Sequence, residues 1–239
     1  MKQGRSHKNP LFYEDYYYRV RYACSFKRLA KQKVSNEMCV LEAGCGKRSV
    51  LKECELTPAR TVGIEILFED IVQNQALDLR TVGNLEDLPF RDEEFDLIIC
   101  RNVVEHLPSP RLVFDEFARV LKEGGMVMIR TPNIYNPLMF ISAVLPLRLR
   151  CWIKRNLLHD EEGDTFPTYY GCNSRRTMTS TLRKAGFTPE EVRFDGLMAY
   201  FDFSTVLLTL IVLYEKLTDF GPLRMFKMWL IAGFRKSSR

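Results

Sequence analysis

The chain has 239 residues, of which 46% are hydrophobic and 27% are charged. This composition excludes a disordered tail, a collagen-like repeat and a disulfide-stapled small protein, and the length suits one large domain. The formal net charge of +5 combines an acidic middle (39–147) with two basic ends. The seven cysteines include no CxxC pair, so neither a zinc cluster nor a redox pair is supported, and a reducing compartment is the simpler interpretation.

The first residues contain no continuous apolar segment, so we expect no secretory signal. Apolar residues spaced three or four apart between Tyr18 and Leu29 predict a first helix within 11–33. The longest uncharged stretches, 131–147 and 203–214, are broken by prolines or shorter than the roughly 18 residues of a membrane span. We therefore expect no transmembrane helix and a cytoplasmic location.

Strands and helices alternate along the middle of the chain. Short apolar runs predict buried strands at Cys39–Glu42, Thr61–Glu65, Phe95–Arg101 and Met126–Arg130. Helical spacing predicts helices at Asp70–Leu79 and Arg111–Leu121, and Gly124-Gly125 predicts a turn. This alternation is typical of an α/β domain with a mostly parallel sheet.

The last third of the chain predicts further elements of the same domain. They are a helix at Arg175–Gly186, strands near 191–194 and 228–234, and an apolar helix at 203–217. We therefore expect a single domain over 1–239 with three parts: an N-terminal helical segment (1–38), a cofactor-binding core (39–133) and a substrate-side elaboration with closing strands (134–239).

A glycine turn follows the first predicted strand, in the segment Val40–Gly46. Gly44 and Gly46 let backbone N–H groups approach a ligand at the carboxyl end of a strand, where α/β sheets bind ligands. Glu65 ends the next strand, 19 residues beyond Gly46, where a carboxylate can accept both ribose hydroxyls of an adenosine. Ser49 stands where a dinucleotide fingerprint needs a third glycine, so the pattern favours an adenosine without phosphates.

A polar and apolar cluster, Asn84-Leu85-Glu86, comes shortly before the buried strand Phe95–Arg101. This placement predicts that the cluster lies beside the adenine end of the same crevice. Each feature alone also fits a structural role, as Glu65 fits a solvated strand end, whereas all three in this order favour a nucleoside site.

Four segments carry a resemblance to a known family: VLEAGCG (40–46), GIEI (63–66), GNLEDLPFRDEEFDLIICRNVVEHL (83–107) and RVLKEGGMVMIRTPN (119–133). LRKAGF (182–187) and WLIAGFRK (229–236) support it more weakly. The chain resembles the class I S-adenosylmethionine-dependent methyltransferases of type 11. The resemblance implies a Rossmann-like methyltransferase fold, with a seven-stranded, mostly parallel sheet, an antiparallel last strand and helices on both faces. It also implies S-adenosylmethionine as the cofactor.

The resemblance further implies nine cofactor-binding residues: Glu42, Gly44 and Gly46 at the methionine part, Glu65 at the ribose, Asn84, Leu85 and Glu86 around the adenine, and Arg101 and Asn102 beside the sulfonium. The chain departs from the family pattern at two places. Asp is more common at position 84, but the amide oxygen of Asn84 also accepts from the adenine amino group. Lys47 and Arg48 follow the turn where a small residue is usual, and we expect them to point away from the cationic sulfonium.

A general base is needed only for an acceptor that is protonated at neutral pH, such as a hydroxyl. His106 is the candidate because it follows a sheet strand beside the cofactor crevice, and its alternative role is to order the loop backbone by hydrogen bonding. Glu105 is expected to be a surface carboxylate or a loop brace.

The acidic run 160–164 lacks calcium-loop spacing, so we expect no metal. Cys45 lacks an activating neighbour, so we expect no reactive thiolate.

The two ends of the chain are expected to shape the acceptor site. Residues 13–18 include four tyrosines, 206–213 is an apolar helical stretch, and the apolar segment 135–149 runs into the basic residues Arg148, Arg150, Lys154 and Arg155. These features fit peripheral contact with the cytoplasmic face of a membrane, and they also fit a lid over a soluble substrate. The chain has no signature of a nucleic-acid-binding module, so nucleic acid is not an expected partner.

The expected function is transfer of a methyl group from S-adenosylmethionine to an unidentified small molecule, for which a lipid-linked or glycosylated acceptor is one class that the sequence suggests. Two alternatives stay open, a nicotinamide-dependent Rossmann oxidoreductase and a non-catalytic relative that serves as a binding or scaffold module. The intact set of Glu42, Gly44, Gly46 and Glu65 argues against the scaffold, because a scaffold needs no adenosine pocket.

Overall fold

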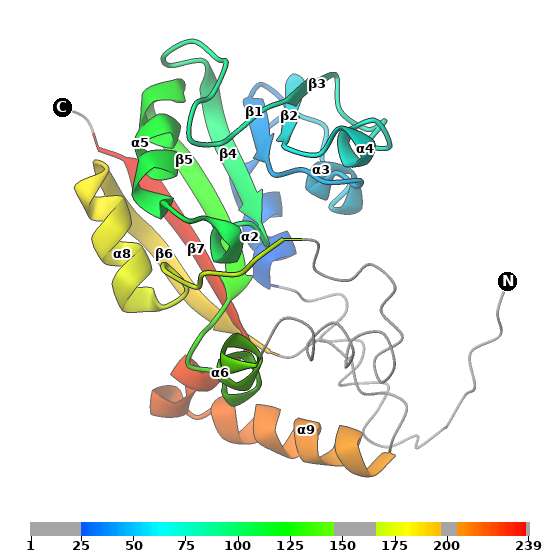
Figure 1. The fold of residues 1–239 in the computed structure, drawn as a ribbon, viewed down its shortest axis with the longest axis vertical. Coiled ribbons are helices and arrows are strands. Elements are labelled where there is room, and N and C mark those ends of the chain that lie inside the picture. The colour runs from blue at the N-terminus through cyan, green and yellow to red at the C-terminus, as the bar shows by residue number, and fades with distance from the viewer. Residues whose placement is uncertain (1–24, 146–165, 197–204, 238–239) are drawn as a thin grey trace, which may run out of the picture.

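The computed structural model describes residues 25–145, 166–196 and 205–237. Seven strands form one sheet: β1 (Cys39–Ala43), β2 (Arg60–Glu65), β3 (Leu79–Val82), β4 (Phe95–Arg101), β5 (Leu121–Pro132), β6 (Phe187–Asp195) and β7 (Trp229–Lys236). The strand order is β3-β2-β1-β4-β5-β7-β6 (Figure 1). β7 is antiparallel to both of its neighbours, and the other neighbouring pairs are parallel. The predicted seven-stranded sheet with an antiparallel last strand is confirmed.

Helices cover both faces of the sheet, as predicted. Alternate residues of the central strands divide between two cores, so that Ile98 and Cys100 of β4 face one side and Leu97 and Ile99 face the other. The first core is covered by α5 (Pro110–Val120) and α8 (Arg175–Lys184), and the second by α2 (Ser25–Lys33) and α3 (Val50–Glu53) (Figure 1). The remaining helical elements are α4 (Phe68–Ile71), η1 (Val104–His106), α6 (Pro137–Val144), α9 (Thr205–Thr218) and η2 (Gly221–Phe226).

The strand order reverses between β1 and β4. After β1 the chain builds outward through β2 and β3, and it then returns to place β4 and β5 on the other side of β1. In open α/β sheets a ligand binds at the carboxyl ends of the strands where the order reverses. In this molecule that point is the end of β1 and β4, and α6 follows β5 at the same edge of the sheet (Figure 1).

The predicted helix at Asp70–Leu79 is wrong. The structure has a short helix, α4, that ends at Ile71, and a separate strand, β3, that begins at Leu79. Val72 and Leu79 are exposed, whereas Ile71 and Leu77 pack inward. The spacing of apolar residues suggested one continuous helical face, but these residues belong to two short elements joined by turns.

The glycine pair at 124–125 lies inside β5 and not in a turn before it. Phe95 of β4 pairs with Leu121, but Leu97 pairs with Met126, so β5 carries an irregularity across the intervening residues. Gly124 has a φ of +70°, a backbone conformation that glycine adopts without strain. The glycines therefore shape a bulge and leave the strand continuous.

Several sequence predictions fall outside the described residues. They concern most of the first helix, the tyrosines of 13–18, the acidic run 160–164 and the basic residues Arg148, Arg150, Lys154 and Arg155. Among the helices of the described ranges, none combines the length and the apolar character that a membrane span requires.

Candidate functional site

The glycine turn after β1 is fixed from two sides. The N–H groups of Gly44 and Cys45 donate to the carbonyl oxygen of Ile64 at 2.9 and 3.2 Å. Gly44 and Gly46 have φ values of +66° and +52°. A Cβ atom at Gly44 would lie 2.4 Å from Cγ2 of Val103, so a side chain there would collide with Val103 in the segment after β4. The turn therefore requires glycine for both conformation and close packing.

Glu42 caps the helix that follows the turn. Its buried carboxylate accepts hydrogen bonds from the Ser49 hydroxyl at 2.6 Å and from the N–H groups of Leu51 and Val50 at 2.9 and 3.1 Å. Burial raises the pKa of Glu42, and the three hydrogen bonds oppose part of that rise. Because the first N–H groups of α3 have no partner within the helix, Glu42 satisfies them and sets where the helix begins.

Glu65 holds the same turn from the end of β2. Its Oε2 accepts from the N–H of Gly46 at 3.0 Å, and its Oε1 accepts from the N–H groups of Ile66 and Leu67 at 2.8 and 3.3 Å. The side chain is buried. The alternative interpretation of Glu65 as a solvated strand end is therefore wrong, and each carboxylate oxygen can accept further hydrogen bonds.

A cavity of about 540 Å³ opens at the ends of β1 and β4. Its volume falls within the roughly 300–1,000 Å³ of typical small-molecule sites. Five residues that the sequence predicted as cofactor-binding line it: Glu42, Gly44, Gly46, Arg101 and Asn102. The structure thus brings the glycine turn and the end of β4 together around one hollow, at the point where the strand order reverses.

Arg101 is held at the cavity wall by a carboxylate that the sequence analysis missed. Its guanidinium forms two hydrogen bonds with Glu53 of α3, at 2.5 and 3.1 Å, and Glu53 also lines the cavity. Burial alone would lower the pKa of Arg101 and raise that of Glu53, but the pairing outweighs burial and moves each pKa in the opposite direction. No local pattern links the two residues, because they are 48 positions apart and meet only through the pairing of β1 with β4.

Lys47 and Arg48 line the cavity, and the expectation that they point away from the sulfonium stays a prediction. Lys47 Nζ lies 3.7 Å from a carboxylate oxygen of Asp70, and Asp70 lines the cavity as well. The wall therefore carries both signs of charge, with carboxylates at Glu42, Glu53 and Asp70 and cations at Lys47, Arg48 and Arg101.

The cluster Asn84-Leu85-Glu86 lies beside Glu65 and outside the lining of this cavity. The N–H of Gly83 donates to the carbonyl oxygen of Glu65 at 3.0 Å, which places the cluster at the end of β2. Asn84 is exposed, and its Oδ1 accepts from the N–H of Glu86 at 3.1 Å, while Leu85 packs into the core. Oε1 of Glu86 is buried and has no hydrogen-bond partner within the described ranges, so it can accept from a donor brought by a ligand.

His106 contacts the loop that precedes α8. Its Nδ1 lies 2.9 Å from the carbonyl oxygen of Pro167, and its ring centre lies 5.9 Å from that of Phe166. A carbonyl oxygen can only accept a hydrogen bond, so Nδ1 is the donor and carries the hydrogen in the neutral ring, which leaves Nε2 as the nitrogen with the free lone pair. This contact is the loop-ordering role, and the catalytic role of His106 stays a prediction because the residue does not line the cavity.

Glu105 is a brace and not a surface carboxylate. Its buried Oε2 accepts from the Thr131 hydroxyl at 2.8 Å, and Asn173 donates to the same hydroxyl oxygen at 2.6 Å. Its backbone carbonyl accepts from the N–H groups of Tyr169 and Tyr170. Glu105 therefore ties η1 and the end of β5 to the segment before α8.

Cys45 is unreactive in this setting, because burial raises the pKa of its thiol to about 12 and leaves almost no thiolate at neutral pH. Within residues 25–145, 166–196 and 205–237, no group of three or more His, Cys, Asp or Glu side chains is arranged to hold a metal ion.

Comparison with known proteins identifies the family. A family model described as a methyltransferase domain matches residues 15–192. The chain belongs to this methyltransferase family. A probable S-adenosylmethionine-dependent methyltransferase of Mycolicibacterium smegmatis is 32% identical over 124 residues, which cover 50% of this chain and 47% of that protein. The mitochondrial ubiquinone biosynthesis O-methyltransferase of Dictyostelium discoideum is 25% identical over 155 residues, 54% of this chain and 48% of that protein.

The chain spans about half the length of these curated relatives. Among solved structures, a chain of the complex between the Haloferax volcanii Trm112 methyltransferase activator and a putative methyltransferase superposes with a TM-score of 0.61. The match covers 95% of this chain and 92% of that chain at 16% identity, which shows a shared fold. The family match argues against the nicotinamide oxidoreductase that the glycine turn had left open.

The methyltransferase family uses S-adenosylmethionine as its cofactor, and the residues of the cavity fit this molecule. Its amino acid end carries a carboxylate, an ammonium and a cationic sulfonium, so a wall with charges of both signs can complement it. Glu65, which holds the turn and is not among the lining residues of the cavity, offers a buried carboxylate of the kind that binds ribose hydroxyls. Gly44 and Gly46 place backbone without side chains at the cavity wall.

Proposed function

We propose that the domain transfers a methyl group from S-adenosylmethionine to a small-molecule acceptor. The main support for this proposal is the cavity at the carboxyl ends of β1 and β4, where the strand order reverses. There the glycine turn held by Glu65 faces the paired Arg101 and Glu53. The cofactor supplies an electrophilic methyl group on a sulfonium. The chain's own task is to bind and orient the reactants in line and to exclude water.

The proposed binding roles follow from the contacts of each residue. Glu65 accepts from the ribose hydroxyls while the N–H of Gly46 keeps its carboxylate in place. Asn84, Leu85 and Glu86 surround the adenine, and the unpartnered Oε1 of Glu86 supports an acceptor role there. Glu42, Gly44 and Gly46 form the floor at the methionine part, with Arg101 and Asn102 at the sulfonium end.

For the acceptor we propose a lipid-linked small molecule in preference to a glycosylated one. Relatives named as ubiquinone biosynthesis O-methyltransferases support an apolar acceptor that is methylated on oxygen. Phe140 and Ile141 of α6 are exposed, and α6 lies at the sheet edge at which the cavity opens (Figure 1). They offer a surface for an apolar tail, whereas a sugar would need polar partners there.

Calorimetric titration with S-adenosylmethionine and with its demethylated product tests the cofactor site. Glu65→Gln is expected to weaken the binding of both by about 1–3 kcal/mol, because ribose hydroxyls and the N–H of Gly46 lose a charged acceptor. Glu69→Gln, the same change at an exposed residue nearby, is the control and is expected to leave both affinities unchanged. Tight binding of a nicotinamide dinucleotide with neither methyl-cofactor ligand would contradict the proposal, and cofactor binding without methyl transfer would indicate a non-catalytic relative.

His106 is the proposed general base when the acceptor is a hydroxyl, because Pro167 fixes the tautomer that leaves Nε2 basic. His106→Asn is expected to lower kcat by about 100- to 10,000-fold and to remove the histidine limb of the pH–rate profile, with cofactor affinity unchanged. The measurement is transfer of labelled methyl groups to extracted cellular lipids across pH. An unchanged kcat together with easier proteolysis near Pro167 would leave only the loop-ordering role.

A further inference from the structure

α9 presents an apolar side to solvent. Four residues at helical spacing, 57–73% exposed, form one stripe: Val206, Leu210, Leu213 and Leu217. Its buried residues include Val212 and the polar Glu215 and Thr218, and Ile211 packs against Met228 and Trp229. A surface helix of a soluble domain normally turns its apolar stripe toward the core and keeps polar residues outside, so α9 departs from that pattern by exposing a second apolar stripe and burying Glu215 and Thr218.

Polar contacts fix this orientation. Lys227, which is buried, lies 2.8 Å from a carboxylate oxygen of Glu215 and 2.9 Å from one of Asp219. The Tyr214 hydroxyl donates to the carbonyl oxygen of Phe226 at 2.6 Å. Turning α9 to bury its leucines would separate the buried charges of Lys227 and Glu215, which is strongly destabilising. The outward stripe is therefore a stable feature of the fold.

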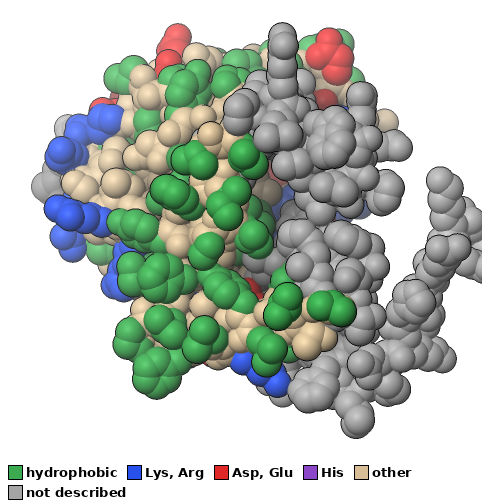
Figure 2. All heavy atoms as spheres, turned by 60° about the horizontal axis from the view of Figure 1, so that its bottom comes forward, with side chains coloured by type: hydrophobic (Ala, Val, Ile, Leu, Met, Phe, Trp, Pro, Cys, Tyr) green, Lys and Arg blue, Asp and Glu red, His purple; other side chains and the backbone are tan. Residues whose placement is uncertain are grey.

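Neighbouring elements extend the stripe into one apolar face. α6 and η2 pack with α9, since Asn136 at the start of α6 donates to the Phe226 carbonyl at 2.9 Å and to the Tyr214 hydroxyl at 3.3 Å. They add further exposed side chains: Leu138, Phe140, Ile141, Val144, Phe220, Met225 and Phe226. Figure 2 shows hydrophobic side chains gathered on the side of the molecule where these helices lie. We call the exposed apolar residues of α6, α9 and η2 the apolar face.

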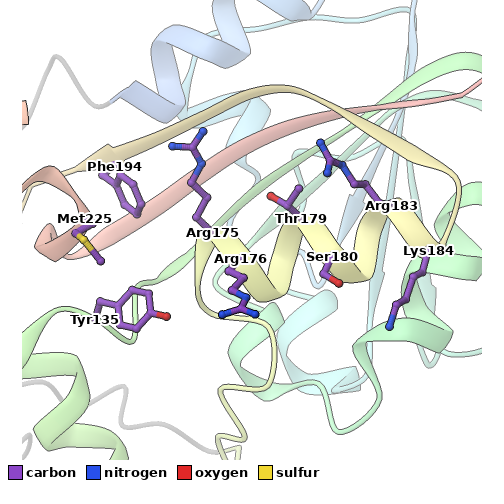
Figure 3. Close-up of a pocket in the computed structure, with 9 residues that line it drawn as sticks. All are labelled: Tyr135, Arg175, Arg176, Thr179, Ser180, Arg183, Lys184, Phe194 and Met225. Atoms are coloured by element: carbon purple, nitrogen blue, oxygen red, sulfur yellow. The ribbon is translucent and has the colours of Figure 1, made fainter. Parts of the chain in front are cut away.

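A basic groove borders the apolar face. It has a volume of about 820 Å³ and runs along α8, where the side chains that line it form two rows, Arg175-Thr179-Arg183 and Arg176-Ser180-Lys184 (Figure 3). None of its four cations forms an ion pair with another residue of the described segments. The groove therefore has uncompensated positive charge.

The groove and the apolar face are continuous. Tyr135 and Met225 are 45% and 40% exposed, and both line the groove at the end where α6 and η2 lie. Figure 3 shows these two side chains and Phe194 beyond the first turn of α8, next to Arg175. Basic residues at the edge of an apolar surface are typical of proteins that lie on membranes containing anionic lipids.

We propose that the apolar face and the α8 groove together lie on an anionic phospholipid membrane. The leucines of α9 and the side chains of α6 and η2 enter the boundary between headgroups and acyl chains, while the α8 cations contact lipid phosphates. Charge complementarity favours this occupant over a second copy of the chain, which would bring the same uncompensated cations to the contact. The groove and the cofactor cavity share no lining residue, so the inference does not depend on the proposed methyl transfer.

Vesicle flotation of the full chain tests the proposal. Two compositions are compared, phosphatidylcholine alone and phosphatidylcholine mixed with phosphatidylglycerol, each at low and high salt. The wild type is expected to float with the anionic vesicles at low salt and to lose most of that binding at high salt. Each cation near an anionic surface contributes about a fivefold factor to partitioning, so Arg175→Gln, Arg176→Gln and Arg183→Gln together are expected to lower it on the order of 100-fold.

Two further variants separate the contributions. Leu210→Ser with Leu213→Ser is expected to lower binding to both vesicle types, because these side chains are exposed and enter the bilayer boundary. The control variant loses the same charge from the opposite face of the sheet, where α2 and α3 lie, through Arg28→Gln, Lys31→Gln and Lys52→Gln. Its flotation is expected to equal that of the wild type. Calorimetry with S-adenosylmethionine is expected to give the same affinity for all three variants, which keeps the outcome distinct from that of the proposed function.

The proposal is overturned if the wild type stays with the soluble fraction at low salt with both vesicle types. It is also overturned if the variant with neutralised α2 and α3 cations loses as much binding as the α8 variant, since a general charge effect would then explain the result. A dimer in light scattering that Leu210→Ser with Leu213→Ser dissociates, in the absence of vesicle binding, would assign the apolar face to a second copy instead.

Discussion

At the scale of single residues, the cavity wall depends on the pairing of Arg101 with Glu53. An isolated guanidinium at the end of β4 would repel a cationic sulfonium, whereas the pair has no net charge. Glu53 is also the last residue of α3, whose start is fixed by Glu42. The residue that caps the helix therefore determines where the carboxylate facing Arg101 is placed.

Glu53→Gln is expected to weaken binding of S-adenosylmethionine more than binding of its demethylated product, which carries no sulfonium charge. The expected difference is about fivefold, on the order of 1 kcal/mol for a partly exposed charge. Calorimetry with both ligands measures it, and Lys52→Gln, an exposed neighbour in the same helix, serves as the control. Equal weakening of the two ligands would show that Glu53 acts through the helix and not through charge.

The sequence predicted five of the residues that line the cavity but not the contacts that hold its wall together. Gly44, Gly46 and Glu65 could be predicted because their roles follow from the order of strand, turn and strand. Glu53 and Asp70 could not, because each reaches the wall through a contact between segments that only the folded sheet brings together. Residue spacing carries no information about such pairs.

At the scale of elements, α5 is tied to the loop before β4 by a charged network. Arg119 donates to Glu116 at 2.7 and 2.8 Å and to the carbonyl oxygens of Leu88 and Phe90 at 2.8 Å each. Glu116 in turn accepts from the N–H of Leu88 at 2.8 Å. Hydrogen bonding from Arg119 lowers the pKa of Glu116.

Glu116→Gln is expected to reduce the free energy of unfolding by about 1–2 kcal/mol at neutral pH, the range for charge-assisted hydrogen bonds. Because the folded-state pKa of Glu116 is lowered, its contribution is fully present above the ordinary glutamate pKa, about 4.3, and is lost as pH falls through the folded value. The free energies of unfolding of wild type and variant are therefore expected to differ at neutral pH and to become equal in acid. Urea unfolding of both proteins at neutral and acidic pH measures this difference.

Asp115→Asn on the same helix is the control, since its pair with Arg111 is exposed and is expected to contribute under about 0.5 kcal/mol. A stability difference for Glu116→Gln that persists unchanged in acid would rule out the charge as its cause.

Elements with a continuous apolar run could be predicted closely, and elements without one could not. β4 and α5 differ from their expected bounds by at most one residue at each end, because their buried faces follow the period of a strand and of a helix. β3 was missed because none of its four residues is buried, so it has no apolar alternation. It is a strand only because β2 supplies a parallel partner.

At the scale of the whole molecule, the sheet could be predicted from the alternation of strands and helices, and the family resemblance added the antiparallel last strand. The sequence left open whether the apolar stretch of α9 lies at a membrane or packs as a lid, so it did not decide that the stripe faces outward. The uncharged run at 203–214 is equally compatible with a buried helix, and its orientation depends on the contact of Lys227 with Glu215. That contact is a property of the assembled fold.

The strand order also has a consequence for synthesis of the chain on the ribosome. β7 lies between β5 and β6 in the sheet but follows both of them in sequence. Until residues 229–236 have emerged, β6 and the helix packed on it have no sheet neighbour, and the edge of β5 is open. Unpaired strand edges recruit other chains. The interval of translation between β6 and β7 is therefore the period in which the nascent protein is most exposed to aggregation, and its end coincides with completion of the sheet.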